Sequence, residues 1–388
     1  MNIKSLMAAC CATIFMAACS GDSAESLTQK GNEALASGDV SAAVEMFSKA
    51  ADKGSASAAR QLGMLYAEGK GTDKSLEKSA ELYALADQLG DSVAPFLLGN
   101  MYETGSGVTS DGKKALELYE KSAAAGHAPA QAQLTDIDFR GRDNIEVDWG
   151  KAYTMSQKAS AGGNADAMAI EGFFLGTGNY GAEKDVKKAL ELLRKSVDNG
   201  SNLGKALYGY ILFWTNSGTK AEAIKMIQES AQAGEPFGIA FTGYCHECGY
   251  LSASFSKANK YYEEAADKGC VWAMARHGMV STDLQYKKQE GHQWWARAAE
   301  RGDGEALSQM GYKYLNGYSV EKSPEKAIEC FNKGAQKGNP TAMSNLGYCY
   351  EEGEGVPADK EKAIMWYQKA VKYGDPYYSQ ERLKRLGK

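Results

Sequence analysis

The sequence predicts an all-α protein, a right-handed α/α solenoid of about ten helix-turn-helix repeats. Three columns of residues recur along the 388-residue chain and lead to this fold class. A glycine recurs inside each first helix, a Ser, Thr or Asp precedes each second helix, and another glycine ends it. Because the starts of the second helices lie 33 to 37 residues apart, the chain is a series of similar units that must stack to bury their apolar faces.

The glycine inside each first helix indicates close helix packing. The segments "LGMLYAEGKG" (62–71), "LGNMYETGSG" (98–107) and "LGYCYEEGEG" (346–355) set the register. Glycine inside a helix costs about 1 kcal/mol relative to alanine, so we expect another helix to approach too closely for a side chain. The column comprises Gly31, Gly63, Gly99, Gly172, Gly209, Gly243, Gly278, Gly311 and Gly347, with Thr135 as the exception.

The second column supplies the N-caps of the second helices, because Ser, Thr and Asp oxygens accept hydrogen bonds from first-turn amides. The glycine after each second helix suits a left-handed C-terminal cap. We expect the solenoid to cover residues 27–375 and a short charged helix at 376–388, about Pro376 to Leu386, to cap this open stack. The N-cap column comprises Asp39, Ser75, Asp111, Asp148, Asp185, Thr219, Ser254, Ser323 and Asp359, with Lys287 as the exception.

The N-terminus carries an export signal. The run from Leu6 to Ala18 is apolar apart from one threonine, follows a single lysine, and is shorter than a membrane span of about 20 residues. Small residues precede Cys19, and the stretch after it is polar, which resembles a bacterial lipoprotein signal at 1–18. That resemblance implies that Cys19 is lipidated, that 19–26 is a short tether, and that Ser20 directs the protein to the outer membrane. Ordinary signal-peptide cleavage and an uncleaved anchor are the alternatives.

The composition predicts a folded chain outside this signal. Hydrophobic residues make up 44% of the sequence and charged residues 24%, which is enough to build a large core. The formal net charge is -5, and the basic residues are scattered among acidic ones. The absence of a basic stripe argues against nucleic acid as a partner.

Residues 342–374 resemble the Sel1-like repeat, an α/α repeat related to tetratricopeptide repeats. Segments 58–90, 94–126 and 306–338 also match, whereas the units between 130 and 303 keep the period and lose many signature side chains. The resemblance implies a protein-binding scaffold without shared catalytic residues or cofactors. The matching residues are Ala342, Leu346, Gly347, Tyr350, Gly353, Gly355, Val356, Asp359, Lys362, Ala363, Trp366, Tyr367, Lys369, Ala370 and Gly374.

Ser-x-x-Lys, a nucleophile motif of penicillin-binding enzymes, occurs at 75–78, 254–257 and 323–326. All three serines fall in the N-cap column, and neither Ser-Asp-Asn nor Lys-Thr-Gly completes the motif. We therefore interpret these serines as caps and expect no catalytic residue. A penicillin-binding or β-lactamase-like cell-wall enzyme is the alternative.

The cysteines leave several interpretations open. Cys245 and Cys248 have the Cys-x-x-Cys spacing of redox pairs and metal sites, so a thiol redox or metal-handling module is a further alternative. Similarity to cysteine-rich members of the family implies structural disulfides instead, with Cys270 pairing with Cys245 or Cys248. Cys330 and Cys349 lie on adjacent elements and could also pair. We expect no metal and no cofactor.

Aromatic residues crowd the middle repeats, which also depart most from the signature. First helices line the concave face of such solenoids, and exposed aromatic side chains anchor partners well. We expect Trp214, His246, Tyr210, Phe241 and Tyr244 to form a partner-binding groove. The sequence thus predicts a non-catalytic, lipid-anchored scaffold that binds a protein or peptide in the bacterial cell envelope, periplasmic or surface facing.

Overall fold

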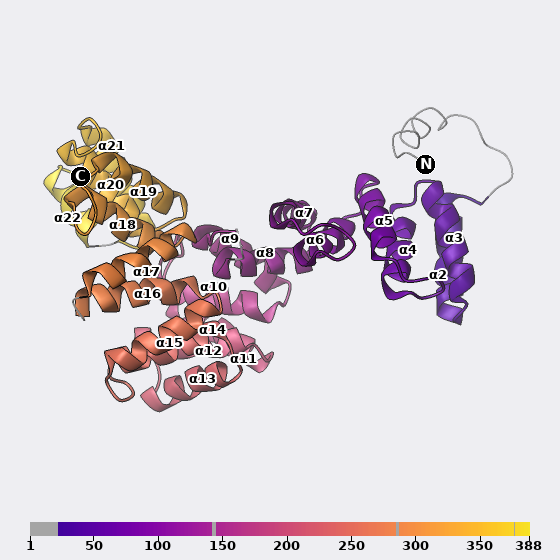
Figure 1. Ribbon diagram of the computed structural model, residues 1–388, viewed down its shortest axis with the longest axis horizontal. Coiled ribbons are helices and arrows are strands. Elements are labelled where there is room, and N and C mark those ends of the chain that lie inside the picture. Colours follow the sequence, from indigo (N-terminus) through magenta and orange to yellow (C-terminus); the bar gives the residue numbers. More distant parts are fainter. Residues whose placement is uncertain (1–21, 142–144, 285–286, 376) are drawn as a thin grey trace. The chain divides into compact units, whose positions relative to one another are not determined.

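The computed structural model describes residues 22–141, 145–284, 287–375 and 377–388. Every regular element in these ranges is a helix, which confirms the all-α prediction (Figure 1). The predicted signal peptide and the first three residues of the predicted tether, Cys19 included, lie outside the described residues. No helix in the described ranges is both long enough and apolar enough to cross a bilayer.

The chain divides into two compact units, residues 1–111 and 112–388, and the boundary falls inside the third repeat. The helices of the first unit are α2 (Ala24–Ser37), α3 (Val40–Asp52), α4 (Ala56–Glu68), α5 (Leu76–Gln88) and α6 (Ala94–Thr104). The first repeat begins at Ala24, slightly earlier than the predicted Leu27, because Ser23 caps α2 by accepting a hydrogen bond from the Ser26 amide.

The second unit holds the remaining repeats and the last helix. Its elements are α7 (Gly112–Ala124), α8 (Ala128–Arg140), α9 (Trp149–Ala161), α10 (Ala165–Thr177), α11 (Val186–Asp198), α12 (Asn202–Thr215), α13 (Lys220–Gln232), α14 (Pro236–Glu247), α15 (Phe255–Asp267), α16 (Val271–Met279) with the π-helix η1 (Val280–Leu284), α17 (Lys288–Glu300), α18 (Gly304–Asn316), α19 (Pro324–Gln336), α20 (Pro340–Glu352), α21 (Lys360–Lys372) and α22 (Tyr378–Arg385). Consecutive helices pair within each unit, α2–α3 and α4–α5 in the first and α8–α9 through α20–α21 in the second, whereas α6 and α7 fall in different units. The short helix α22 follows the last pair.

The N-cap column is confirmed at most of its positions. In each case the side-chain oxygen accepts a hydrogen bond from the amide three residues later, which satisfies a donor that the first turn leaves unpaired. Lys287, the sequence exception, precedes α17 without a side-chain cap. The capping residues are Asp39, Ser75, Asp148, Asp185, Thr219, Ser254, Ser323 and Asp359.

In most repeats the glycine of the first helix lies against an aromatic ring of the second helix, and at Gly172 and Gly209 it lies against Leu193 and Ile227 instead. A Cβ atom added at Gly347 would be 2.6 Å from the ring of Tyr367, and one at Gly63 would be 2.7 Å from the ring of Tyr83. Both tyrosines are buried. The close approach predicted from this column is therefore confirmed.

The second unit folds back on itself, which the expected open stack does not include. The Val147 amide donates to the Arg301 carbonyl at 2.8 Å, and the Tyr180 amide donates to the Tyr373 carbonyl at 3.1 Å. Lys337 forms an ion pair with Glu146 at 3.1 Å. These contacts join repeats that are far apart in sequence, and they bring the first helices of early and late repeats to the same cavity.

Candidate functional site

A cavity of about 650 Å³ lies inside the second unit. Its walls come from α10, α12, α16, α18, α20 and α22, together with the start of α9 and the chain segments after α10 and α21. Most of these helices are first members of their pairs. Eight aromatic residues contribute to the lining: Trp149, Phe173, Tyr180, Tyr210, Trp214, Trp272, Tyr312 and Tyr378.

Tyr210 is the centre of this aromatic wall. Its ring stacks on Trp214, four residues later on α12, with a centroid distance of 6.2 Å and an interplanar angle of 14°. The ring also stacks on Phe241 at 4.6 Å and meets Trp272 edge-on at 6.0 Å. Offset and edge-to-face ring pairs of this kind are favourable beyond the area they bury. The cavity wall is therefore preorganised before any ligand enters.

The aromatic lining has a buried floor and an exposed rim. Phe173 and Tyr210 are buried, whereas Trp214, Tyr312 and Tyr378 are 51%, 48% and 43% exposed. A ligand that covers these exposed rings would remove their apolar surface from water, which favours binding. The rim is therefore the part of the cavity best suited to hold a partner.

The structure brings two of the five predicted partner-binding residues to the cavity. Tyr210 and Trp214 line it. Tyr244 is half-buried and contacts Tyr210 and Trp272, with centroid distances of 5.5 Å and 6.4 Å, but it does not line the cavity. Its role is to support the rings that do.

Phe241 and His246 require a correction. Phe241 is fully buried behind Tyr210, so a ligand in the cavity would not touch it. His246 is 8% exposed, its Nδ1 atom lies 2.7 Å from the Ser252 carbonyl oxygen, and its ring stacks on Tyr261. The hydrogen bond to Ser252 therefore fixes the loop after α14 and occupies the Nδ1 atom inside the protein.

A simple sequence signal could have found some of the missed lining residues. The position immediately after the column glycine faces the cavity in three repeats, where it is occupied by Phe173, Tyr210 and Tyr312. Reading that column would have identified Tyr312. Trp149, Tyr180 and the late residue Tyr378 reach the cavity only because the second unit folds back, and no local pattern indicates this.

The polar lining of the cavity is acidic. Its charged members are Glu305 and Asp375, and the described lining contains no Lys, Arg or His. The Glu305 carboxylate accepts hydrogen bonds from Gln309, Asn339 and Thr341, and Asp375 accepts one from Ser379. Neither carboxylate forms an ion pair within the described part of the chain. The cavity therefore presents negative charge beside aromatic rings.

The buried tyrosines of the lining remain neutral. Burial raises the pKa of Tyr210 to about 12 and raises that of Tyr180 well above its usual value. Both groups are therefore phenols rather than phenolates at physiological pH. They add hydroxyl groups to the lining and no negative charge.

The five described cysteines, Cys245, Cys248, Cys270, Cys330 and Cys349, are free thiols, so the predicted disulfides are absent from the structure. Burial raises the pKa of Cys245 to about 12 and also raises the pKa of Cys248. A reactive cysteine needs a lowered pKa, because the thiolate is the nucleophile and metal ligand. Within the described ranges, no group of three or more Cys, His, Asp or Glu side chains is placed to hold a metal ion. The geometry gives no support to the redox or metal alternative.

The Ser-x-x-Lys serines act as helix caps. Ser75, Ser254 and Ser323 accept hydrogen bonds from the amides of the lysines in the same motifs, at 3.2, 3.2 and 3.4 Å. The ammonium group of Lys78 lies 5.0 Å from the Tyr66 ring centroid, on the preceding helix. Both parts of the motif thus have structural roles, and nothing in this arrangement favours the cell-wall enzyme alternative.

The family comparison gives an independent view of the repeats. The family model described as Sel1 repeat matches residues 29–55, 56–91, 92–127, 165–201, 236–270, 273–303, 304–339 and 340–375. The helix pairs α8–α9 and α12–α13 occupy the two long intervals that the model leaves unmatched. No curated protein in the comparison matches the chain.

Several solved structures resemble the chain. One is a protective antigen of uropathogenic Escherichia coli strains with an SLR fold, at 24% identity and a TM-score of 0.47, covering 94% of this chain and 80% of that one. A Sel1 repeat protein from Oxalobacter formigenes is 24% identical, with a TM-score of 0.42 and 95% of each chain covered. An immunity protein from Pseudomonas aeruginosa is 19% identical, with a TM-score of 0.33, covering 64% of this chain and 83% of that one. Since the family model matches more than half of the sequence, the chain belongs to the Sel1 repeat family.

Proposed function

We propose that this protein is a lipid-anchored scaffold of the bacterial cell envelope that binds a segment of a partner protein in its aromatic cavity. The Sel1 repeat fold suggests in general that a protein is a scaffold for protein interactions. The observation that carries the proposal for this chain is the lining of the cavity, where exposed Trp214, Tyr312 and Tyr378 surround a buried aromatic floor.

The cavity has the properties of a binding site for a protein segment. Its volume of about 650 Å³ falls in the range of roughly 300–1,000 Å³ typical of ligand sites. Tryptophan and tyrosine dominate the energetics of protein interfaces, because they bury much apolar area and lose little side-chain entropy. Since Tyr210 already holds Trp214 in a stack, little ordering would be required when a partner binds.

The location of the scaffold is part of the proposal and is supported by the N-terminal sequence. A lipid on Cys19 would leave only a few residues before α2, which begins at Ala24. The first repeat would therefore lie close to the membrane. Ser20 after the lipidated cysteine favours the outer membrane, with the solenoid facing the periplasm or the surface.

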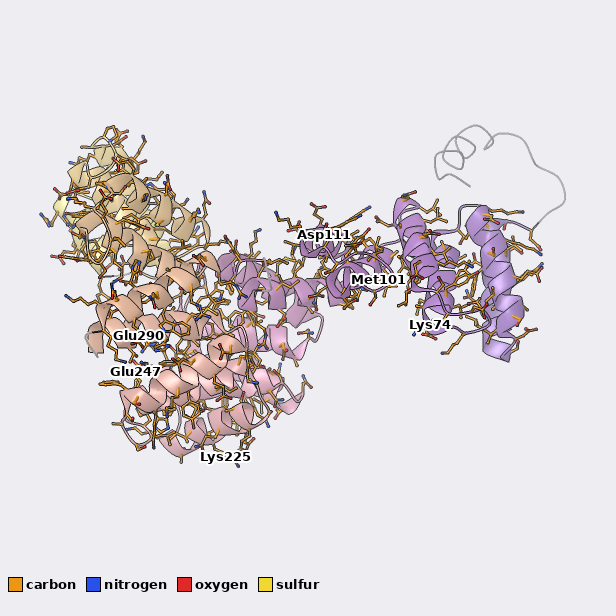
Figure 2. All side chains as sticks on the ribbon, viewed as in Figure 1. Lys74, Met101, Asp111, Lys225, Glu247 and Glu290 are labelled. Carbon is orange, nitrogen blue, oxygen red and sulfur yellow. The ribbon has the colours of Figure 1, made fainter. Side chains whose placement is uncertain are left out.

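Site-specific photocrosslinking tests binding in the cavity. We would replace Tyr312, on the rim, with a photoreactive amino acid and express the protein with its own N-terminus in a Gram-negative host. The control carries the same amino acid at Lys225, on the outward side of α13 (Figure 2), whose side chain is 70% exposed and which does not line the cavity. A defined adduct from position 312 and none from 225 is the expected result. Equal labelling at both positions would contradict binding in the cavity.

Lipidation is tested separately with an alkyne-labelled fatty acid. The wild-type chain should incorporate the label and fractionate with membranes, whereas a Cys19→Ser variant should do neither. Label that persists in the variant would show that Cys19 is not the anchor.

A further inference from the structure

The cavity differs from an ordinary apolar groove in its charge. Two carboxylates, Glu305 and Asp375, line it together with eight aromatic rings, and the described lining contains no basic side chain. Elsewhere in the second unit, partly buried carboxylates have cationic partners: Glu235 binds Arg140 at 2.6 Å, and Glu351 binds Arg382 at 3.2 Å. The two carboxylates of the cavity thus lack the kind of partner that the rest of the unit provides.

The two carboxylates flank one segment of the lining. Glu305, on α18, accepts a hydrogen bond at 3.2 Å from Thr341, near the start of α20. Asp375 accepts one at 2.8 Å from Ser379, whose hydroxyl lies 2.9 Å from that of Ser344 on α20. The N-terminal half of α20 therefore lies between the two acidic groups and fixes both of them at the cavity.

The aromatic rings of the lining already bind guanidinium groups outside the cavity. The guanidinium carbon of Arg276 lies 5.7 Å from the Trp272 ring centroid, and that of Arg382 lies 5.3 Å from the Tyr378 centroid. Arg276 is neutralised by Glu247, labelled in Figure 2, and neither arginine lines the cavity. Aromatic faces attract cations through their quadrupole, more strongly when water is excluded. Trp214 and Tyr312, the other exposed rings of the rim, can offer the same kind of face to a cation of a ligand.

One more polar group suits the main chain of a peptide. Asn345 lies on α20 in the cavity lining, and its side-chain amide nitrogen donates to Ser308 at 3.0 Å. This bond fixes the orientation of the carboxamide, and its oxygen has no hydrogen-bond partner within the described part of the chain. The oxygen can accept a backbone N–H from a ligand.

We propose that the cavity binds an extended polypeptide segment through an Arg or Lys side chain, which Glu305 and Asp375 pair with beside the aromatic rim. Negative charge and aromatic faces both favour a cation, whereas an acidic segment would bring like charges together in a partly desolvated site. Arginine fits especially well, because its planar guanidinium can stack on a ring and bind a carboxylate with two hydrogen bonds. This inference rests on the proposed function, since it specifies the chemistry of the partner segment.

A random heptapeptide library displayed on phage gives the first test. We would select the library against the purified full mature chain. A parallel selection would use a Glu305→Gln/Asp375→Asn variant of the same chain. The matched control, Glu361→Gln/Asp198→Asn, makes the same charge change at exposed positions outside the cavity. Wild type and control should enrich peptides rich in Arg and Lys, and the cavity variant should lose this enrichment.

The second test measures affinity with one selected peptide, labelled for fluorescence anisotropy. The cavity variant should bind it at least about tenfold more weakly than wild type or control, as expected for a lost charge-assisted contact. A peptide with citrulline in place of arginine, which keeps the shape and removes the charge, should show a similar loss. Circular dichroism confirms that each variant is folded.

The outcomes separate this inference from the proposed function. Enrichment of neutral or acidic peptides, or equal affinity for the arginine and citrulline forms, would overturn the cation inference. If such peptides still compete with the adduct at position 312, the scaffold proposal stands. Failure of every peptide to bind, together with no adduct at position 312, would overturn both.

Discussion

Asp303 offers a test of how burial controls ionisation next to the cavity. Its carboxylate caps α18 by accepting a hydrogen bond from the Ala306 amide at 2.7 Å, and the residue is 2% exposed. Burial raises its pKa from 3.8 to about 7. Replacing Asp303 with Asn keeps a good capping group and removes the charge, so the variant should be more stable than wild type above pH 7.

The magnitude and its sign follow from proton linkage. Between about pH 4 and pH 7 the folded state keeps a proton on Asp303 that the unfolded state has released, so stability falls as the pH rises through this window. A pKa difference of about three units, from 3.8 to about 7, corresponds to at most about 4 kcal/mol. The stability advantage of Asp303→Asn should therefore be near zero at pH 4 and reach its full value near pH 8.

Urea unfolding followed by circular dichroism between pH 4 and pH 8 measures this advantage, and amide exchange in α18 localises it. Asp359→Asn is the matched control, because Asp359 also caps a helix but has a lowered pKa, caused first by the hydrogen bond from the Lys362 backbone. Its contribution is present above its unfolded pKa, so this variant should gain nothing as the pH rises. An advantage of Asp303→Asn that does not change with pH would refute the conclusion that burial raises the pKa of Asp303.

Three further predictions concern the repeats and the cysteines. Gly347→Ala should destabilise the protein by about 1 to 2 kcal/mol in urea unfolding, because overpacking outweighs the gain in helix propensity; Gly112→Ala, which meets only one atom at 4.0 Å, should not. In native thiol titration at pH 8, exposed Cys248 should react before buried Cys245, and equal rates would contradict the burial. Ser323→Ala should cost about 1 kcal/mol in the same unfolding assay, and no loss would show that the cap is dispensable.

The sequence predicted the repeats well because their causes are local. A cap such as Ser254 acts on an amide three residues away, and a glycine such as Gly347 is required by the next helix of the same pair. Local requirements of this kind recur at a fixed period and can be recognised in an alignment of the chain with itself.

The cavity was predicted only in part, because its formation depends on distant contacts. Trp214 could be recognised as an aromatic residue in excess of what the core needs. Tyr180 and Tyr378 could not, since the contact that brings their parts of the chain together is a backbone hydrogen bond from Tyr180 to Tyr373. His246 was expected in the same groove, but its side chain is buried and its Nδ1 atom is hydrogen-bonded to the Ser252 carbonyl oxygen.

Divergent and matching repeats both contribute to the cavity. The two unmatched pairs, α8–α9 and α12–α13, supply Trp149, Tyr210 and Trp214 to its lining. These pairs keep the helical period, so the stack continues through them, and the matching repeats add Phe173 and Tyr312 at the position that Tyr210 occupies in α12. Consistency between local pattern and fold is usually given up where a protein binds or acts. The divergent pairs therefore contribute part of the aromatic lining, and the matching repeats contribute the rest, including Glu305 and Asp375, which a cationic segment would meet.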